Sequence, residues 1–206
     1  MVLLRFLFIF FIILSVNSFG QDCSPRSINF KSGEKITYRA VYNWGFIWVN
    51  AGDVEFLVYD TIYMGKPAFH FKSQGWSLKQ YDWFFKVRDR FESIVSTSLQ
   101  PLWFERDTYE GGFMVYNRYD FNPSAKNLVV ASQTSDRPFK VDTLALKGCT
   151  FDVLSAIYFC RTLNFDLYKK GDRIPLTMAI DNEVFDLYIR YLGRERLLTR
   201  DGKVYN

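Results

Sequence analysis

KITYRAVY, the segment Lys35–Tyr42, alternates between two kinds of side chain. On an extended strand, Ile36, Tyr38, Ala40 and Tyr42 lie on one face, and Lys35, Thr37 and Arg39 lie on the other. This alternation predicts a half-buried β-strand. Further strands that pair with this one are therefore expected along the chain.

Strands are predicted on both sides of three short turns, each containing glycine or a run of polar residues, as in β-hairpins. The turns are 64–66 between strands 54–63 and 67–73, 110–112 between 99–109 and 113–121, and 181–183 between 174–180 and 184–192. Further strands are predicted at 84–95, 128–132, 139–144 and 194–199. Gly52 is expected to mark a bulge or bend.

One helix is predicted among these strands, at 150–163 (TFDVLSAIYFCRTL), where apolar residues recur at helical spacing. Thr150 is the expected N-cap, and Asp152 suits the positive end of the helix dipole. The predicted fold class is mainly β (α+β), a curved antiparallel sheet or half-barrel wrapped around one main helix.

The composition supports a sheet with a wide apolar face. The chain has 206 residues, including 21 Phe, 13 Tyr and 5 Trp, and a formal net charge of +4. Aromatic side chains favour pleated surfaces. A charge this small argues against a nucleic-acid partner.

The N-terminal residues 1–20 resemble a secretory signal peptide, with Arg5 before an apolar run at 7–14. A polar lead-in at 21–33 and a single β-rich domain at 34–206 are expected to follow. Export would place the protein in the periplasm or at the outer membrane. No transmembrane segment is expected after signal removal. Asp22 before Cys23 argues against lipidation, because a lipobox needs a small residue there.

Three cysteines leave at least one unpaired. Cys149 and Cys160 are predicted to lie about 16 Å apart along the helix, too far for a disulfide. Cys160 is then expected to be a small core residue. Cys23 with Cys149 is the only pairing that stays open.

The single histidine, His70, excludes zinc sites that need two histidines, and any Ser-His-Asp triad would have to use it. The loop 110–112 lacks the GK[ST] ending of a phosphate-binding loop. The turn 181–183 lacks the spacing of an EF-hand. We therefore predict no catalytic residue, no metal site and no cofactor.

Asp89 is the most informative charged residue, because it shares a predicted strand face with Phe85, Val87 and Phe91. A buried carboxylate needs a partner or a shifted pKa. The buried-charge candidates are Asp89 and its possible partners Arg106 and Arg118. Two interpretations of Asp89 remain open. It is either part of an ion pair that sets the strand register, or a ligand anchor or general base. An envelope hydrolase would need Asp89 with a second carboxylate, for which Glu92, Glu105, Asp107 and Glu110 are considered.

The candidates for lining an apolar cavity are aromatic. Trp44, Phe46 and Trp48 are predicted to alternate on one strand face, and Trp83 and Phe85 follow. These rings form either a solid core or the lining of a cavity in a half-open barrel. The main hypothesis is an exported protein that binds a lipid or other hydrophobic small molecule. The alternative is a non-catalytic interaction or scaffold module of the envelope with an envelope protein partner.

Four blocks, in order along the chain, resemble domain-of-unknown-function family 3108, whose members are exported Bacteroidetes proteins. The blocks are GEKITYRAVYNWGFIWVNAGDVEF at 33–56, KVRDRFES at 86–93, PLWFERDTYEGG at 101–112 and FDVLSAIYFCRTL at 151–163. The resemblance implies a fold similar to the LolA/LolB lipoprotein carriers, a curved half-barrel closed by helices. It implies a concave surface that takes acyl chains, with no settled activity. It also implies a final hairpin beyond Asn206, which this chain would then lack.

Overall fold

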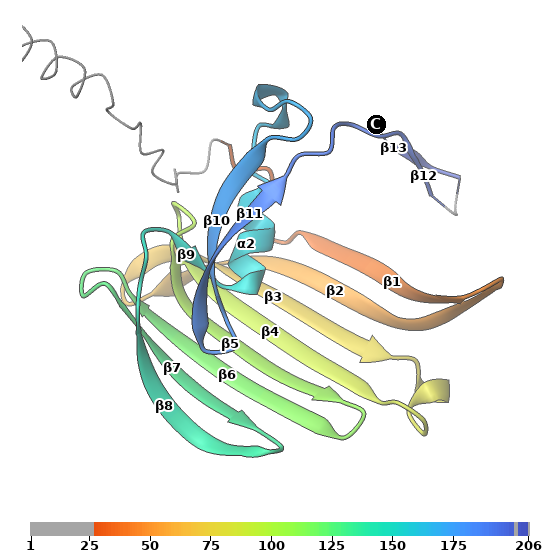
Figure 1. Cartoon of the computed structure of the whole chain (residues 1–206), viewed down its shortest axis with the longest axis horizontal. Helices are drawn as coiled ribbons and strands as arrows, with labels where there is room; N and C mark the ends of the chain where they lie inside the picture. Colours follow the sequence, from red (N-terminus) through yellow and green to blue (C-terminus); the bar gives the residue numbers. More distant parts are fainter. Residues whose placement is uncertain (1–26, 200–201, 206) are drawn as a thin grey trace, which may run out of the picture.

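The computed structural model describes residues 27–199 and 202–205. Eight strands form one antiparallel sheet in which each strand pairs with its neighbour in sequence. The strands are β1 (Lys35–Trp44), β2 (Ile47–Tyr63), β3 (Lys66–Ser77), β4 (Val87–Ser96), β5 (Pro101–Glu110), β6 (Phe113–Asn122), β7 (Asn127–Thr134) and β8 (Arg137–Ala145). Figure 1 shows a strongly curved, open sheet with its first and last strands at opposite edges. The predicted mainly β fold class is confirmed.

The three predicted hairpins are also confirmed, but the chain between Trp44 and Trp48 differs from the prediction. Trp44 pairs with Ile47 across a turn at Gly45 and Phe46, so two strands meet here in place of one. Gly45 has φ of 62°, a left-handed conformation that favours glycine and lets the chain reverse. The interpretation that Trp44, Phe46 and Trp48 share one strand face is therefore wrong.

The helix α2 (Val153–Cys160) begins later than predicted, with Asp152 as its N-cap. Thr150 and Phe151 instead form the short strand β9 (Thr150–Phe151), which pairs in parallel with β10 (Arg173–Ile180). The sheet pairing takes these residues out of the helix, so Thr150 is not the cap. The Asp152 carboxylate accepts hydrogen bonds from the backbone N–H groups of Leu154 and Ser155, each at 2.9 Å.

Strand β10 and β11 (Glu183–Arg190) form a hairpin that lies with α2 over the concave side of the sheet (Figure 1). Helix α2 packs against β3 and β4. The remaining described elements are the 3-10 turns η1 (Lys79–Tyr81) and η2 (Phe165–Leu167), and the ribbon of β12 (Leu197–Leu198) and β13 (Val204–Tyr205).

The main core lies between the concave face and α2. Phe71, Phe104 and Tyr119 from the sheet are almost fully buried, as is Tyr158 from the helix. The Tyr158 ring stacks on Phe71 with centroids 3.8 Å apart. This end of the concave face is therefore filled by protein.

Two cysteines are described beyond the lead-in. Cys149 is disulfide-bonded and Cys160 is free, so the predicted absence of a bond between them is confirmed. Cys23, like the predicted signal peptide, lies outside the described residues.

Candidate functional site

The concave face is covered over only part of its length. The tip of the β10–β11 hairpin reaches the middle of the sheet, where Asp181 forms an ion pair with Arg106 at 3.1 Å. At the same tip, the Asn117 side-chain amide donates to Asn182 Oδ1 at 3.3 Å. Beyond this contact, the ends of β1 to β4 nearest η1 enclose an open groove of about 780 Å³.

Small and branched residues form the floor of this groove. In the strand register, Gly75 of β3 lies between Val54 of β2 and Asp89 of β4. A Cβ placed on Gly75 would make only ordinary contacts, at 3.8 Å from Asp89 Cβ and 3.8 Å from Val54 Cγ2. The missing side chain of Gly75 thus creates space in the floor.

The segment 78–86 forms one wall of the groove and contributes Tyr81, Phe84 and Phe85 to its lining. Its position is held by Asp82, which pairs with Arg88 at 2.5 Å and accepts a hydrogen bond from Ser77 Oγ at 2.5 Å. Asp82 thus ties the segment to β3 and β4 through polar contacts. The aromatic rings of the segment line the groove or face solvent.

Asp89 is a carboxyl group in this otherwise mostly apolar lining. Its Oδ1 atom is buried and has no hydrogen-bond partner among the residues that the structure describes. Burial, and next the nearby Glu110 carboxylate, raise the pKa of Asp89 to about 6, although Arg106 and a backbone hydrogen bond from Tyr109 oppose this change. Asp89 therefore gives the groove lining a carboxyl group whose hydrogen-bonding capacity is not filled.

Neither arginine considered from the sequence forms an ion pair with Asp89 in the described structure. Arg106 shares its face of the sheet, but its guanidinium pairs with Asp181 in the hairpin tip. Arg118 lies on the convex face and pairs with Asp120 at 3.0 Å.

The five aromatic candidates occupy different positions. Phe85 lines the groove. Trp48 at the start of β2, Phe46 in the preceding turn and Trp83 in segment 78–86 are 59%, 92% and 85% exposed. Trp44 ends β1. Sequence reasoning missed the floor residues, and Gly75 within a strand was the signal that could have indicated them.

The other acidic candidates are divided between the two faces of the sheet. Glu92 lies on the convex face, where it contacts His70 Nε2 at 2.7 Å and Lys72 Nζ at 3.3 Å. Burial, and next Lys72, lower the pKa of His70. Glu105 also lies on the convex face, whereas Glu110 shares the concave face with Asp89.

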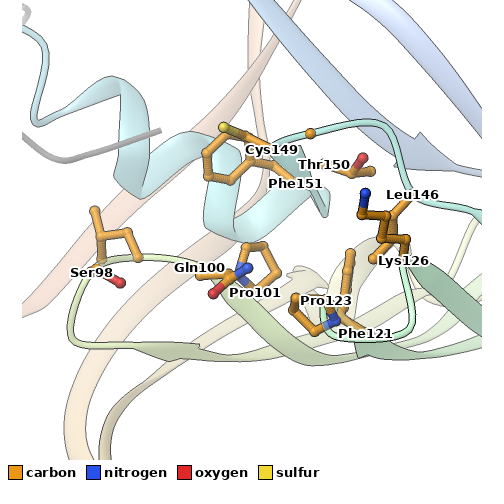
Figure 2. A pocket seen from close by; sticks show the side chains of 12 residues that line it. Ser98, Gln100, Pro101, Phe121, Pro123, Lys126, Leu146, Cys149, Thr150 and Phe151 are labelled. Atoms are coloured by element: carbon orange, nitrogen blue, oxygen red, sulfur yellow. The ribbon is translucent and has the colours of Figure 1, made fainter. Parts of the chain in front are cut away.

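A second hollow of about 550 Å³ lies at the other end of the strands. Figure 2 shows its lining, which comes from the β4–β5 turn, the β6–β7 turn and the segment that leads into β9. Gln100, Lys126 and Thr150 place polar groups around Phe121 and Phe151. This mixed lining is less suited to an apolar molecule than the groove beside Gly75.

Within residues 27–199 and 202–205, no group of three potential metal-ligating side chains was found. In the same residues, no helix combines the length and the apolar character needed to cross a bilayer.

The architecture is therefore an open, curved antiparallel sheet. It holds a helix and a hairpin in its concave side, with an apolar groove beside them. Residues 37–206 match the family described as "Protein of unknown function (DUF3108)". The chain belongs to this family, as the resemblance of its four blocks predicted. No curated protein and no solved structure matches the chain. The likeness to the LolA/LolB carriers and the Bacteroidetes origin stay predictions.

Proposed function

We propose that this is an exported protein of the cell envelope that holds a lipid or other hydrophobic small molecule in the groove beside Gly75. The observation that carries the proposal is the groove itself, about 780 Å³ in volume and lined mainly by apolar and aromatic side chains. This volume lies in the range of small-molecule sites, which are concave and mostly apolar with few polar groups.

Asp89 adds a chemical preference to this proposal. With a pKa of about 6, its carboxyl group is mostly ionised at pH 7. A carboxylate in an apolar surrounding repels another carboxylate and attracts a hydrogen-bond donor or a cation. The preferred occupant is therefore a molecule with an apolar body and a neutral or cationic donor, rather than a free fatty acid.

Filling the groove tests the proposal. Gly75→Leu adds a side chain to the floor, whereas Gln74→Leu adds the same side chain on the convex face of the same strand. Uptake of the neutral fluorescent probe N-phenyl-1-naphthylamine would be measured by titration, with circular dichroism to confirm folding. We expect the affinity of the Gly75→Leu variant to fall about tenfold, and that of Gln74→Leu to match the parent chain.

Two results would overturn the proposal. One is equal probe affinity of the folded Gly75→Leu variant and the parent chain. The other is a parent chain that binds no probe and, by native mass spectrometry after purification from the periplasm, carries no lipid. Recovery of the protein outside the exported fraction would overturn its placement in the envelope.

A second candidate, an envelope hydrolase, is favoured by one observation. Asp89 and Glu110 share the concave face, and the Glu110 charge contributes to the raised pKa of Asp89. A carboxyl group that titrates near pH 6 suits general acid–base chemistry. The candidate predicts turnover of an ester or glycoside that Asp89→Asn abolishes, and it fails if activity survives that change.

A further inference from the structure

Four large aromatic rings are exposed on the two chain segments that border the groove. Phe46 is 92% exposed, Trp83 85%, Phe84 76% and Trp48 59%. We call these four residues the aromatic rim. Single exposed apolar residues are common on protein surfaces, whereas a group of large ones marks an interaction site.

The aromatic rim comes from two separate segments on two sides of the groove. Phe46 and Trp48 belong to the β1–β2 hairpin, which lines the groove through Tyr42 and Val49. The other two rings belong to segment 78–86. Figure 1 shows the β1–β2 turn and η1 at the same end of the sheet, away from the β10–β11 hairpin. Phe84 itself lines the groove, whereas Trp48 follows the groove-lining Tyr42–Val49 pair in the register and so lies on the opposite face of its hairpin. The rim therefore surrounds this end of the sheet, where the groove opens.

The two segments that carry the rim have a positive net charge. Residues 42–50 contain no charged side chain, and segment 78–86 contains only Lys79, Asp82 and Lys86. The Asp82 carboxylate is neutralised by Arg88. Lys79 and Lys86 are exposed and form no ion pair with the described residues. Lys86 Nζ lies 5.7 Å from the centre of the Tyr109 ring. The rim therefore combines indole and phenyl rings with two exposed positive charges.

We propose that the aromatic rim binds the surface of an anionic lipid bilayer, with the groove mouth facing the membrane. Trp and Phe side chains favour the boundary between headgroups and acyl chains. Lysines beside them favour anionic headgroups, each contributing attraction that salt screens. This inference adds a membrane partner to the proposed function, and it holds whatever the groove contains.

Co-sedimentation with vesicles tests the inference. The full chain would be mixed with vesicles of phosphatidylcholine alone or with one quarter phosphatidylglycerol. The test variant is Phe46→Ser/Trp83→Ser/Phe84→Ser. The matched control is Ile62→Ser/Met64→Ser, which removes side chains that are 76% and 85% exposed at the β2–β3 turn, far from the rim. Both variants keep the same N-terminal segment, so its own membrane affinity cancels from the comparison.

We expect the rim variant to bind anionic vesicles at least about tenfold more weakly than the parent, and the control within about twofold. Lys79→Gln/Lys86→Gln is expected to remove most of the difference between anionic and neutral vesicles. Equal vesicle binding of the rim variant and the parent would overturn the inference, as would a parent chain that binds neither vesicle. Light scattering that shows a parent dimer dissociated by the rim variant would assign the rim to a second copy and overturn it too.

Probe uptake by the same proteins separates the two proposals. A parent chain that binds vesicles through the rim but takes up no probe would support the membrane contact and contradict ligand binding. The opposite pair of results would support ligand binding and contradict the membrane contact.

Discussion

Phe85 packs so tightly on the β5–β6 turn that a Cβ atom on Gly111 would lie 2.3 Å from Phe85 Cε2. Real Cβ atoms do not approach another carbon this closely, so either the ring or the turn would have to move. Phe85 also lines the groove. The absence of a side chain at Gly111 therefore sets the position of one groove wall.

Gly111→Ala is expected to displace Phe85 and weaken probe binding several-fold. It should also destabilise the fold by about 1 to 2 kcal/mol, because Gly111 has φ of 58° and alanine is strained there. Gly65→Ala is the control, with φ of 76° and no atom within 4 Å of the added Cβ. Gly65→Ala should lose similar stability in urea and keep its probe affinity. Equal affinities of the two variants would contradict this account of the groove wall.

The pH dependence of stability should report Asp89. Its pKa is about 6 in the folded chain against 3.8 as the reference value, so the folded state binds the proton more tightly between these values. The free energy of unfolding should therefore fall as pH rises from about 4 to 6, by about 1 to 2 kcal/mol after allowance for solvent screening. Asp89→Asn should lack this fall and be the more stable protein at pH 7. Urea titrations of both proteins at pH 4.5 and 7 would measure it, and parallel pH profiles would refute it.

Asp152 joins helix α2 to the sheet. Its buried carboxylate caps the helix and also accepts hydrogen bonds from Ser93 Oγ at 2.9 Å and Ser155 Oγ at 2.7 Å. Asp152→Ala should cost about 3 kcal/mol, since a cap is lost and buried donors are left unpaired. Asp152→Asn keeps an acceptor for the backbone N–H groups and should cost about 1 kcal/mol. Similar losses for the two variants would show that the volume of the side chain, not its hydrogen bonds, matters here.

Arg161 holds the first described segment against the helix. Its guanidinium pairs with both carboxylate oxygens of Glu34, at 2.5 and 3.0 Å, and lies 5.9 Å from the centre of the Phe30 ring. The hydrogen bond to Arg161 is the main reason that the pKa of Glu34 is lowered. Lysine cannot form this two-pronged contact, so Arg161→Lys should lose about 1 kcal/mol and speed proteolysis near residue 30. Unchanged stability and cleavage in the lysine variant would contradict this role.

The period-2 alternation was enough to predict most of the strands. Around Lys35–Tyr42 and the turn at 110–112, local sequence and tertiary pairing favour the same structure. The turn at Gly45 was missed because the alternating rings on either side of it also fit a continuous strand. A glycine at the first position of a two-residue turn was the feature that distinguished the two.

The site was less predictable, because it depends on which strands lie side by side. Alternation placed Asp89 on an apolar face. It could not show that Arg106 forms its ion pair with Asp181, which belongs to a hairpin and lies 75 residues further along the chain. The beginning of α2 was misplaced for a similar reason, since the pairing of Thr150 with Thr177 is a non-local contact.

The order of the strands has a consequence for how the chain acquires its structure. Because every strand of the large sheet pairs with its neighbour in sequence, the sheet can assemble progressively as synthesis proceeds. The elements that cover its concave face, α2 and the β10–β11 hairpin, come only after residue 150. A partly synthesised chain therefore passes through a stage in which the aromatic side of the sheet is bare. At that stage chaperones, apolar ligands or other copies of the chain can bind the exposed apolar side chains.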